Sequence, residues 1–145
     1  MRKYFFSSVV LLSLSTMITS CTKKGCIDSF AKNYDSSAKS SDGSCSYQGS
    51  VIIWADQTFA QAAFDAGITT WNFSISGSPV GSMATTTYFN SAPDCGTNGA
   101  VTIVKDLGSL SSKDFTVEVT DENGDLVATY TVTFKGGVCS NWKLN

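Results

Sequence analysis

The 145-residue sequence contains no histidine, only two prolines and few charged residues, which make up 15% of the chain. The missing histidine excludes a Ser-His-Asp triad, a histidine general base and a histidine metal ligand. No glycine-rich phosphate-binding loop is present either, because the glycines are spread over expected turns. The sequence shows no active site, and we expect a protein that is not an enzyme.

Carboxylate pairs are the remaining groups for catalysis. Several acids gather around an expected hairpin, and they are Asp114, Glu118, Asp121, Glu122 and Asp125. Glycosidase chemistry needs one carboxylic acid whose pKa is raised in an apolar pocket. Nothing around these acids indicates such a pocket, and acids on a strand and in a turn are typical of a solvated sheet edge. A carboxylate-based hydrolase is therefore only the distant alternative.

The N-terminus has the layout of a helical signal peptide. Arg2 and Lys3 precede a run of apolar and small hydroxyl residues that is too short to cross a bilayer. The run ends in Ile18-Thr19-Ser20-Cys21, which resembles the lipobox of bacterial lipoproteins. The resemblance implies cleavage of residues 1–20, a diacylglyceryl group on Cys21 and an acyl chain such as palmitate on its amine. An ordinary secreted protein with a chance cysteine is the alternative interpretation.

The mature chain, from Cys21 onward, is expected in the cell envelope as one domain with a short leader. It keeps eight basic and twelve acidic residues, a net charge of −4, because Arg2 and Lys3 leave with the signal peptide. This charge argues against nucleic acid or an anionic membrane surface as a partner. Thr22 stands where some lipoproteins carry an inner-membrane retention aspartate. The resemblance therefore implies an outer-membrane lipoprotein, on either face of that membrane.

Four cysteines remain once Cys21 is assigned to lipid, and they can pair in three ways. We predict disulfides between Cys26 and Cys45 and between Cys95 and Cys139, because each pair brackets a self-contained unit. Loops of these lengths stabilise by about 3 and about 4 kcal/mol through lost chain entropy. A zinc–thiolate site is the alternative, but no CxxC spacing occurs and exported cysteines are normally oxidised.

Residues 25–48 form a small Cys-bracketed module after a lipidated tether at 21–24. The segment begins with Gly-Cys at 25–26, continues with Ala-Lys-Asn-Tyr at 31–34 and closes with Asp-Gly-Ser-Cys-Ser-Tyr at 42–47. This pattern resembles a module that recurs in secreted and surface proteins of Bacteroidota. Its apolar residues are too few to form a core, so a disulfide has to hold it together.

Four side chains of this module carry oxygens that can surround one hard cation such as calcium: Asp28, Asn33, Asp35 and Asp42. Their spacing does not fit an EF-hand loop, which needs ligands at alternate positions and a final glutamate. Asx side chains also cap turns through their own backbone. We therefore expect turn capping, with a weak calcium site as the alternative and no other cofactor.

Beyond residue 50, apolar and polar residues alternate as in strands with one buried face. The expected strands are 51–54, 70–76, 101–103, 115–120, 130–135 and 138–144, with turns between them that include one at 77–79. One short helix is expected at 56–66, capped by Asp56, and Trp54 and Trp71 are expected in the core. Half-buried strands need a second layer, so we predict an all-β fold, an antiparallel two-layer sandwich over residues 50–145.

Several softer motifs of this second part resemble the C-terminal domain of many small Bacteroidota lipoproteins. They are the Trp-Asn-Phe-Ser-Ile at 71–75 followed by Val-Gly-Ser at 80–82, the Ala-Pro-Asp-Cys-Gly at 92–96, the Lys-Asp-Leu-Gly at 105–108 and the Gly-Val-Cys at 137–139. The resemblance implies a transthyretin-like or immunoglobulin-like sandwich on the cell envelope, and it implies no particular chemistry.

A non-catalytic binding role is the function that we expect. Tyr88 and Phe89 lie just before a turn, and Trp142 lies beside polar residues near the last strand. Aromatic rings at such places can face solvent and stack on a glycan or contact an envelope protein. The alternative function is that of a structural or accessory subunit of an envelope complex.

Overall fold

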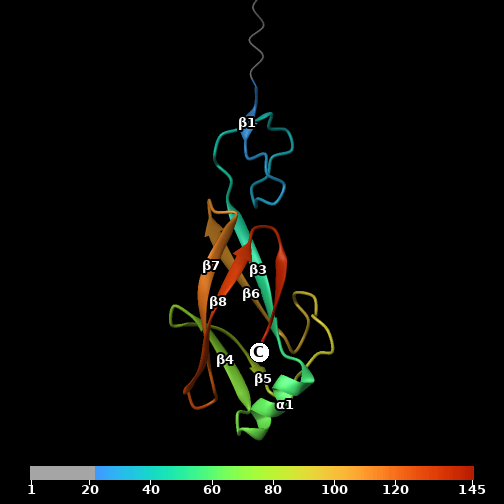
Figure 1. Cartoon of the computed structure of the whole chain (residues 1–145). Helices are drawn as coiled ribbons and strands as arrows, with labels where there is room; N and C mark the ends of the chain where they lie inside the picture. The colour runs from blue at the N-terminus through green and yellow to red at the C-terminus, as the bar shows by residue number, and fades with distance from the viewer. Residues whose placement is uncertain (1–21) are drawn as a thin grey trace, which may run out of the picture.

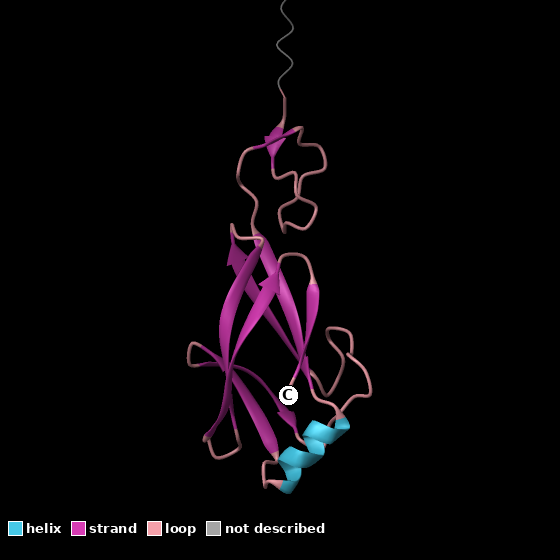
Figure 2. Ribbon diagram, in the orientation of Figure 1, coloured by secondary structure: helices cyan, strands magenta, loops and turns pink. Residues whose placement is uncertain are grey.

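The structure is a computed structural model that describes residues 22–145, so the expected signal peptide and the lipid-bearing Cys21 lie outside the described residues. Two parts follow one another along a long axis (Figure 1). The Cys-bracketed module lies at the N-terminal end and consists mostly of loops (Figure 2). Its regular structure is one short parallel pair, β1 (Lys24–Gly25) with β2 (Ser40–Ser41).

The rest of the described chain forms two sheets whose apolar faces pack against each other. The three-stranded sheet has the order β6-β3-β9, with β6 at Val101–Gly108, β3 at Tyr47–Trp54 and β9 at Cys139–Lys143. The four-stranded sheet has the order β5-β4-β7-β8, with β5 at Ser78–Ala84, β4 at Thr70–Ile75, β7 at Ser112–Thr120 and β8 at Leu126–Lys135. This arrangement confirms the predicted all-β two-layer sandwich.

One pair of strands departs from the fully antiparallel arrangement that we expected. β9 runs parallel to β3, with Ser50 opposite Cys139 and Trp54 opposite Lys143. The reason lies in the turn after β8, where Gly136 pairs with Gly49 and the chain crosses to the other sheet. Since β9 starts at the same end of the sandwich as β3, the two strands run in the same direction.

A second difference concerns the expected turn at 77–79. The turn itself is at Ser76 and Gly77, whose φ angles of 51° and 73° suit a two-residue hairpin of type I′. Ser78 and Pro79 already belong to β5, which pairs with β4 at the edge of its sheet. Proline is tolerated there because one side of an edge strand needs no ladder hydrogen bond.

The core confirms the expected positions of the tryptophans in strands. Trp71 and Phe73 of β4 and Phe134 of β8 are almost completely buried, and Trp54 is 8% exposed. The predicted helix is α1 (Gln57–Asp65), which lies at the end of the molecule opposite to the module (Figure 1). Asp56 caps it as predicted, because its Oδ1 accepts a hydrogen bond of 2.9 Å from the backbone N–H of Phe59.

The module and the sandwich share residues at their boundary. β3 begins at Tyr47, inside the segment that we assigned to the module, and Tyr47 is buried. The backbone N–H of Lys32 donates to the carbonyl of Ser46 at 2.8 Å, just before β3 starts. No linker therefore separates the two parts, and the module continues directly into the central strand of the three-stranded sheet.

We expect Gly49→Ala to lower the free energy of unfolding by about 2 kcal/mol, because overpacking a tight contact typically costs about 1–3 kcal/mol. A Cβ at Gly49 would lie 2.7 Å from the carbonyl oxygen of Lys135, a backbone atom that cannot move aside. Urea unfolding of the purified variant measures the change. Gln48→Ala, at an exposed position of the same strand, is the control and is expected to change stability by less than about 0.5 kcal/mol. Equal stabilities of the two variants would contradict the close approach.

Candidate functional site

Both disulfides form with the predicted pairing. Cys26 is bonded to Cys45 across the module, with 4.8 Å between the Cα atoms. Cys95 is bonded to Cys139, with 6.1 Å between the Cα atoms, and this bond ties the loop between β5 and β6 to the first residue of β9. The first bond therefore holds the module, and the second holds the longest loop of the sandwich.

Asp28 belongs to the candidate calcium set, but its carboxylate is engaged within the fold. Its Oδ1 accepts a hydrogen bond of 3.0 Å from the backbone N–H of Phe30, and its Oδ2 accepts one of 2.7 Å from the hydroxyl of Tyr47. The Tyr47 hydroxyl, followed by the Phe30 N–H, lowers the pKa of Asp28. The same hydrogen bond raises the pKa of Tyr47. Asp28 thus joins the module to the start of β3.

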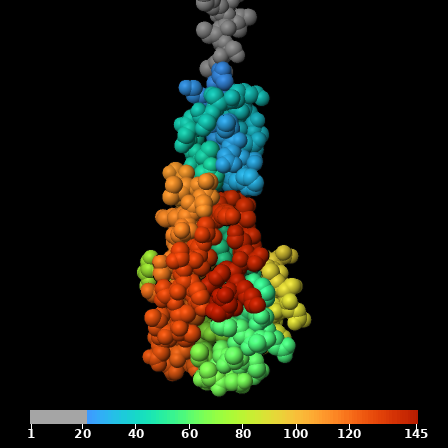
Figure 3. Space-filling model, viewed as in Figure 1, coloured from blue at the N-terminus to red at the C-terminus, as the bar shows by residue number. Residues whose placement is uncertain are grey.

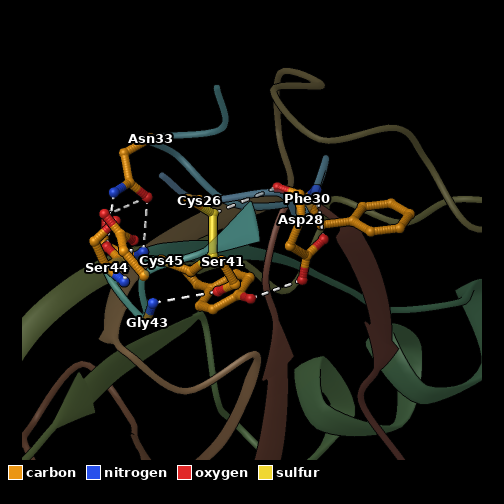
Figure 4. Close-up of a disulfide and its surroundings, with 11 residues drawn as sticks. Cys26, Asp28, Phe30, Asn33, Ser41, Gly43, Ser44 and Cys45 are labelled. Carbon is orange, nitrogen blue, oxygen red and sulfur yellow. Dashed lines mark hydrogen bonds between the residues drawn. A yellow bond between two sulfur atoms is a disulfide. The ribbon is translucent and has the colours of Figure 1, made fainter. Parts of the chain in front are cut away.

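Asn33 and Asp42 form hydrogen bonds to residues 44–46, on the other side of the module. Asn33 donates from Nδ2 to the carbonyl of Ser44 at 2.7 Å and accepts at Oδ1 from the N–H of Ser46 at 2.8 Å. Asp42 accepts from the N–H of Ser44 at 2.9 Å. The Ser44 hydroxyl and then its N–H lower the pKa of Asp42. Figure 4 shows Asn33 and Asp28 on opposite sides of the disulfide, so they do not face a common point.

Asp35 completes the set and pairs with a lysine. Its Oδ2 lies 2.8 Å from Nζ of Lys23, and its Oδ1 accepts a hydrogen bond of 2.9 Å from the N–H of Ser37. Lys23, and then Ser37, lower the pKa of Asp35 well below its usual range. Within residues 22–145, no three carboxylate, thiol or imidazole side chains lie close enough together to hold a metal ion. Asp28, Asp35 and Asp42 each cap a turn by accepting from the N–H group two residues later, whereas Asn33 joins the 31–34 segment to Ser44 and Ser46, so the four side chains are engaged in separate contacts within the module.

Tyr88 and Phe89 lie in the loop 85–100, which has neither strand nor helix and connects β5 to β6. Tyr88 is 46% exposed, whereas Phe89 is half-buried. The backbone N–H of Phe89 donates to the carbonyl of Ala55 at 2.9 Å, which attaches this part of the loop to the residue that follows β3. Among the predicted ligand contacts, Tyr88 is the residue with a largely free ring.

Trp142 does not present its ring freely, contrary to our expectation for a residue beside polar neighbours. It is half-buried, and its ring packs edge-to-face against Tyr130 of β8, with 4.8 Å between the centroids. The hydroxyl of Tyr130 donates to the backbone oxygen of Asn145 at 2.8 Å. The ring of Trp142 thus helps to hold β8 against β9. Trp142 packs on Tyr130, whereas the loop of Tyr88 is attached through Phe89 to Ala55, so the structure gives the predicted ligand contacts different partners.

Two acids of the β7–β8 hairpin, Asp121 and Glu122, accept hydrogen bonds from backbone N–H groups, whereas Asp114 and Glu118 accept from the hydroxyls of Thr133 and Ser74. Oδ1 of Asp121 accepts from the N–H groups of Asn123 and Asp125, both at 2.8 Å. The Asp125 N–H makes the largest contribution to the lowered pKa of Asp121. Glu122 accepts from the N–H of Thr69 at 3.0 Å; its own N–H, and then that of Thr69, lower its pKa. A general acid requires the opposite shift, which disfavours a carboxylate-based hydrolase at this hairpin.

Sequence reasoning missed a set of contacts at the C-terminal end of β3. Lys143 of β9 forms an ion pair with Asp56, the cap of α1, and its Nζ lies 5.8 Å from the ring centroid of Trp54. The Nε1 of Trp54 is buried and donates no hydrogen bond among the described residues. No local signal links Lys143 to Asp56, because the pair depends on the parallel register of β9 with β3. Residues 22–145 contain no pocket, so the candidate contacts lie on an open surface.

Comparison of the chain with protein-family models, with curated proteins and with solved structures found no match. α1 is far too short to cross a bilayer, and residues 22–145 contain no other helix that is long and apolar enough to do so. The function therefore has to be argued from the site itself.

We expect Tyr47→Phe to destabilise the protein at pH 7, because the change removes the hydroxyl that hydrogen-bonds to Asp28. Hydrogen bonding depresses the pKa of Asp28 in the folded state. The stability that this carboxylate contributes is therefore fully present above its unfolded-state pKa of about 3.9, and it is lost as the pH falls through the lower folded-state pKa. The difference in urea midpoint between the native and variant proteins should therefore shrink below about pH 4. Tyr34→Phe, at an exposed tyrosine of the same module, is the control. A difference that stays constant down to pH 2 would contradict the role of Asp28.

Proposed function

We propose that this chain is a lipid-anchored cell-envelope protein with a non-catalytic binding role, in which the loop around Tyr88 contacts a glycan or a protein partner. The observation that carries the proposal is the position of the two ends. Residue 22, next to the expected lipid, lies at the module end, whereas the loop projects from the side of the sandwich (Figures 1 and 3). Phe89, next to Tyr88, is bonded to Ala55 just beyond the far end of β3, so a lipid on Cys21 would hold the Tyr88 part of the loop away from the bilayer.

β3 sets the distance between these ends. It starts at Tyr47, where it meets the module, and its eight residues end at Trp54, directly before Ala55 holds the loop. Eight residues in extended conformation span about 25 Å. The module adds to this length on the membrane side. The part of the loop that carries Tyr88 is therefore well clear of the lipid headgroups and accessible to a partner.

The loop 85–100 has the properties of a binding loop. Loops longer than about 12–15 residues that contain no helix or strand are uncommon in small domains, and those that are ordered usually have a function. The Cys95–Cys139 disulfide fixes this loop. Two hydrogen bonds add to it, one from the N–H of Phe89 to the carbonyl of Ala55 and one of 2.8 Å from the N–H of Gly96 to Oγ1 of Thr102. Because it is already ordered, little conformational entropy is lost when a ligand binds.

The exposed ring of Tyr88 defines the chemistry of the contact. A tyrosine side chain offers a flat apolar face together with a hydroxyl, and it loses little rotamer freedom on binding. Such a ring can stack on the apolar face of a sugar or insert into the surface of a protein. Exposed Asn90 and Asn98 lie on the same loop and supply amide donors and acceptors for either partner.

The anchor is tested by mass spectrometry of the protein isolated from the envelope of a bacterial host. We expect a mature N-terminus at Cys21 that carries three acyl chains, because several chains are needed for lasting attachment. Cys21→Ser should remain an uncleaved precursor, whereas Cys95→Ser, which removes a different thiol, should still be acylated. A mature chain whose residue 21 carries no lipid would contradict the proposal.

The binding role is tested by a glycan array and by photo-crosslinking from residue 88 in whole envelopes. We expect a ligand whose affinity drops about tenfold or more in Tyr88→Ala, because truncating a tyrosine that anchors an interface typically costs more than about 1 kcal/mol. Tyr34→Ala is the matched control, since Tyr34 is 47% exposed but lies in the module. Binding that is equally strong in both variants would exclude the loop as the contact.

An accessory role in an envelope complex is the second candidate, and exposed apolar side chains support it. Phe30 is 58% exposed, Leu110 is 52% exposed and Leu126 is 66% exposed. Exposed apolar surface marks sites of protein interaction where it is contiguous, and the turns of Phe30 and Leu110 both adjoin the segment of Gly136 and Gly137. Crosslinking followed by isolation under native conditions should then yield a complex of fixed stoichiometry, and Leu126→Ser should weaken it. A monomer in every fraction would argue against this role.

A further inference from the structure

The module and the sandwich carry opposite net charges. Residues 22–46 contain four lysines and three aspartates, a net charge of +1. Residues 47–145 contain four lysines and nine acids, a net charge of −5. The net charge of −4 of the mature chain argued against an anionic membrane surface as a partner. That value is the sum of a positive module and a negative sandwich. The protein is therefore a charge dipole along its long axis.

Three of the module's lysines lie together at the end nearest to Cys21. The backbone N–H of Lys39 donates to the carbonyl of Lys23 at 2.8 Å, and Lys24 pairs with Ser40 in the β1–β2 ladder. Figure 1 shows β1 at the N-terminal end of the module, farthest from the sandwich. Lys23 forms an ion pair with Asp35, whereas exposed Lys24 and Lys39 form no ion pair within residues 22–145. Two of the three lysines are thus exposed and have no ion-pair partner among the described residues.

The tether is too short to separate these lysines from a membrane. Only Thr22 and Lys23 lie between Cys21 and Lys24, so the Cα atoms of Cys21 and Lys24 are at most about 11 Å apart. An acylated cysteine lies at the level of the headgroups. This bound is close to one Debye length, roughly 8–10 Å at physiological ionic strength, so the charges of Lys23 and Lys24 are only partly screened from the lipid phosphates, and Lys39 lies beside Lys23.

On the proposed acylation of Cys21, on which this placement depends, we propose that Lys23, Lys24 and Lys39 bind the phosphate groups of anionic lipid headgroups around the anchor. Clustered lysines next to a membrane anchor are attracted to anionic lipids, whereas the acidic sandwich is repelled by the same surface. Both forces turn the long axis away from the bilayer. The module then faces the membrane, and the part of the loop around Tyr88 is held away from it.

The test uses the full chain, reconstituted into vesicles of phosphatidylcholine alone or mixed equally with phosphatidylglycerol. Acetylation of each lysine by an amine-reactive ester is followed by mass spectrometry. We expect Lys23, Lys24 and Lys39 to react about threefold or more slowly on the anionic vesicles, and high salt should remove the difference. Lys113 and Lys135, exposed on β7 and β8, should react equally on both vesicles.

Two double variants with the same change of charge complete the test. In Lys24→Gln/Lys39→Gln the slower acetylation of Lys23 on anionic vesicles should disappear, whereas Lys113→Gln/Lys135→Gln should keep it. If the native chain floats with both vesicles but each of Lys24 and Lys39 reacts at the same rate on the anionic and the neutral vesicles, the proposed headgroup contact is overturned and the proposed lipid anchor is supported. If the chain floats with neither vesicle, both the anchor and the contact are overturned.

Discussion

The close approach of two backbones at Gly49 and Gly136 is the constraint on which the rest of the structure depends. These residues pair between β3 and the end of β8, and Tyr47 lies over Gly136 so closely that a Cβ there would be 2.6 Å from its ring. The backbone of Phe30 lies similarly close to the next residue, Gly137. The two sheets and the module therefore meet at one point where side chains larger than hydrogen do not fit.

Local patterns in the sequence were sufficient to predict much of this structure. A period of two placed Trp71 and Phe73 on a buried face, because a strand alternates its side chains whatever its neighbours are. Asp56 was recognised as a cap because its hydrogen bond spans only three residues. The disulfide pairing followed from the way in which the cysteines bracket two units, and Asp28 and Asp42 cap their own turns.

Features that depend on contacts between distant residues were not predictable in the same way. The alternation in β5 is weak because most of this edge strand is exposed, so its residues resemble a turn. The parallel pairing of β9 with β3 depends on where the chain crosses between sheets. Trp142 follows a polar residue, yet its ring is covered by Tyr130 from the other sheet, and local polarity carries no information on that contact.

The same junction gives the molecule a fixed direction. If a flexible linker joined the module to the sandwich, the acidic sandwich could turn in any direction and its loop could approach the bilayer. Instead Tyr47 lies within the segment assigned to the module and is also the first residue of β3, and its hydroxyl is held by Asp28 at 2.7 Å. Lys23 is already held to the module by Lys39 and Asp35, which leaves Thr22 as the link to the expected lipid. Any interaction that orients Lys23 and its neighbours at the headgroups therefore orients the loop around Tyr88 as well, because the chain between them is continuous and packed.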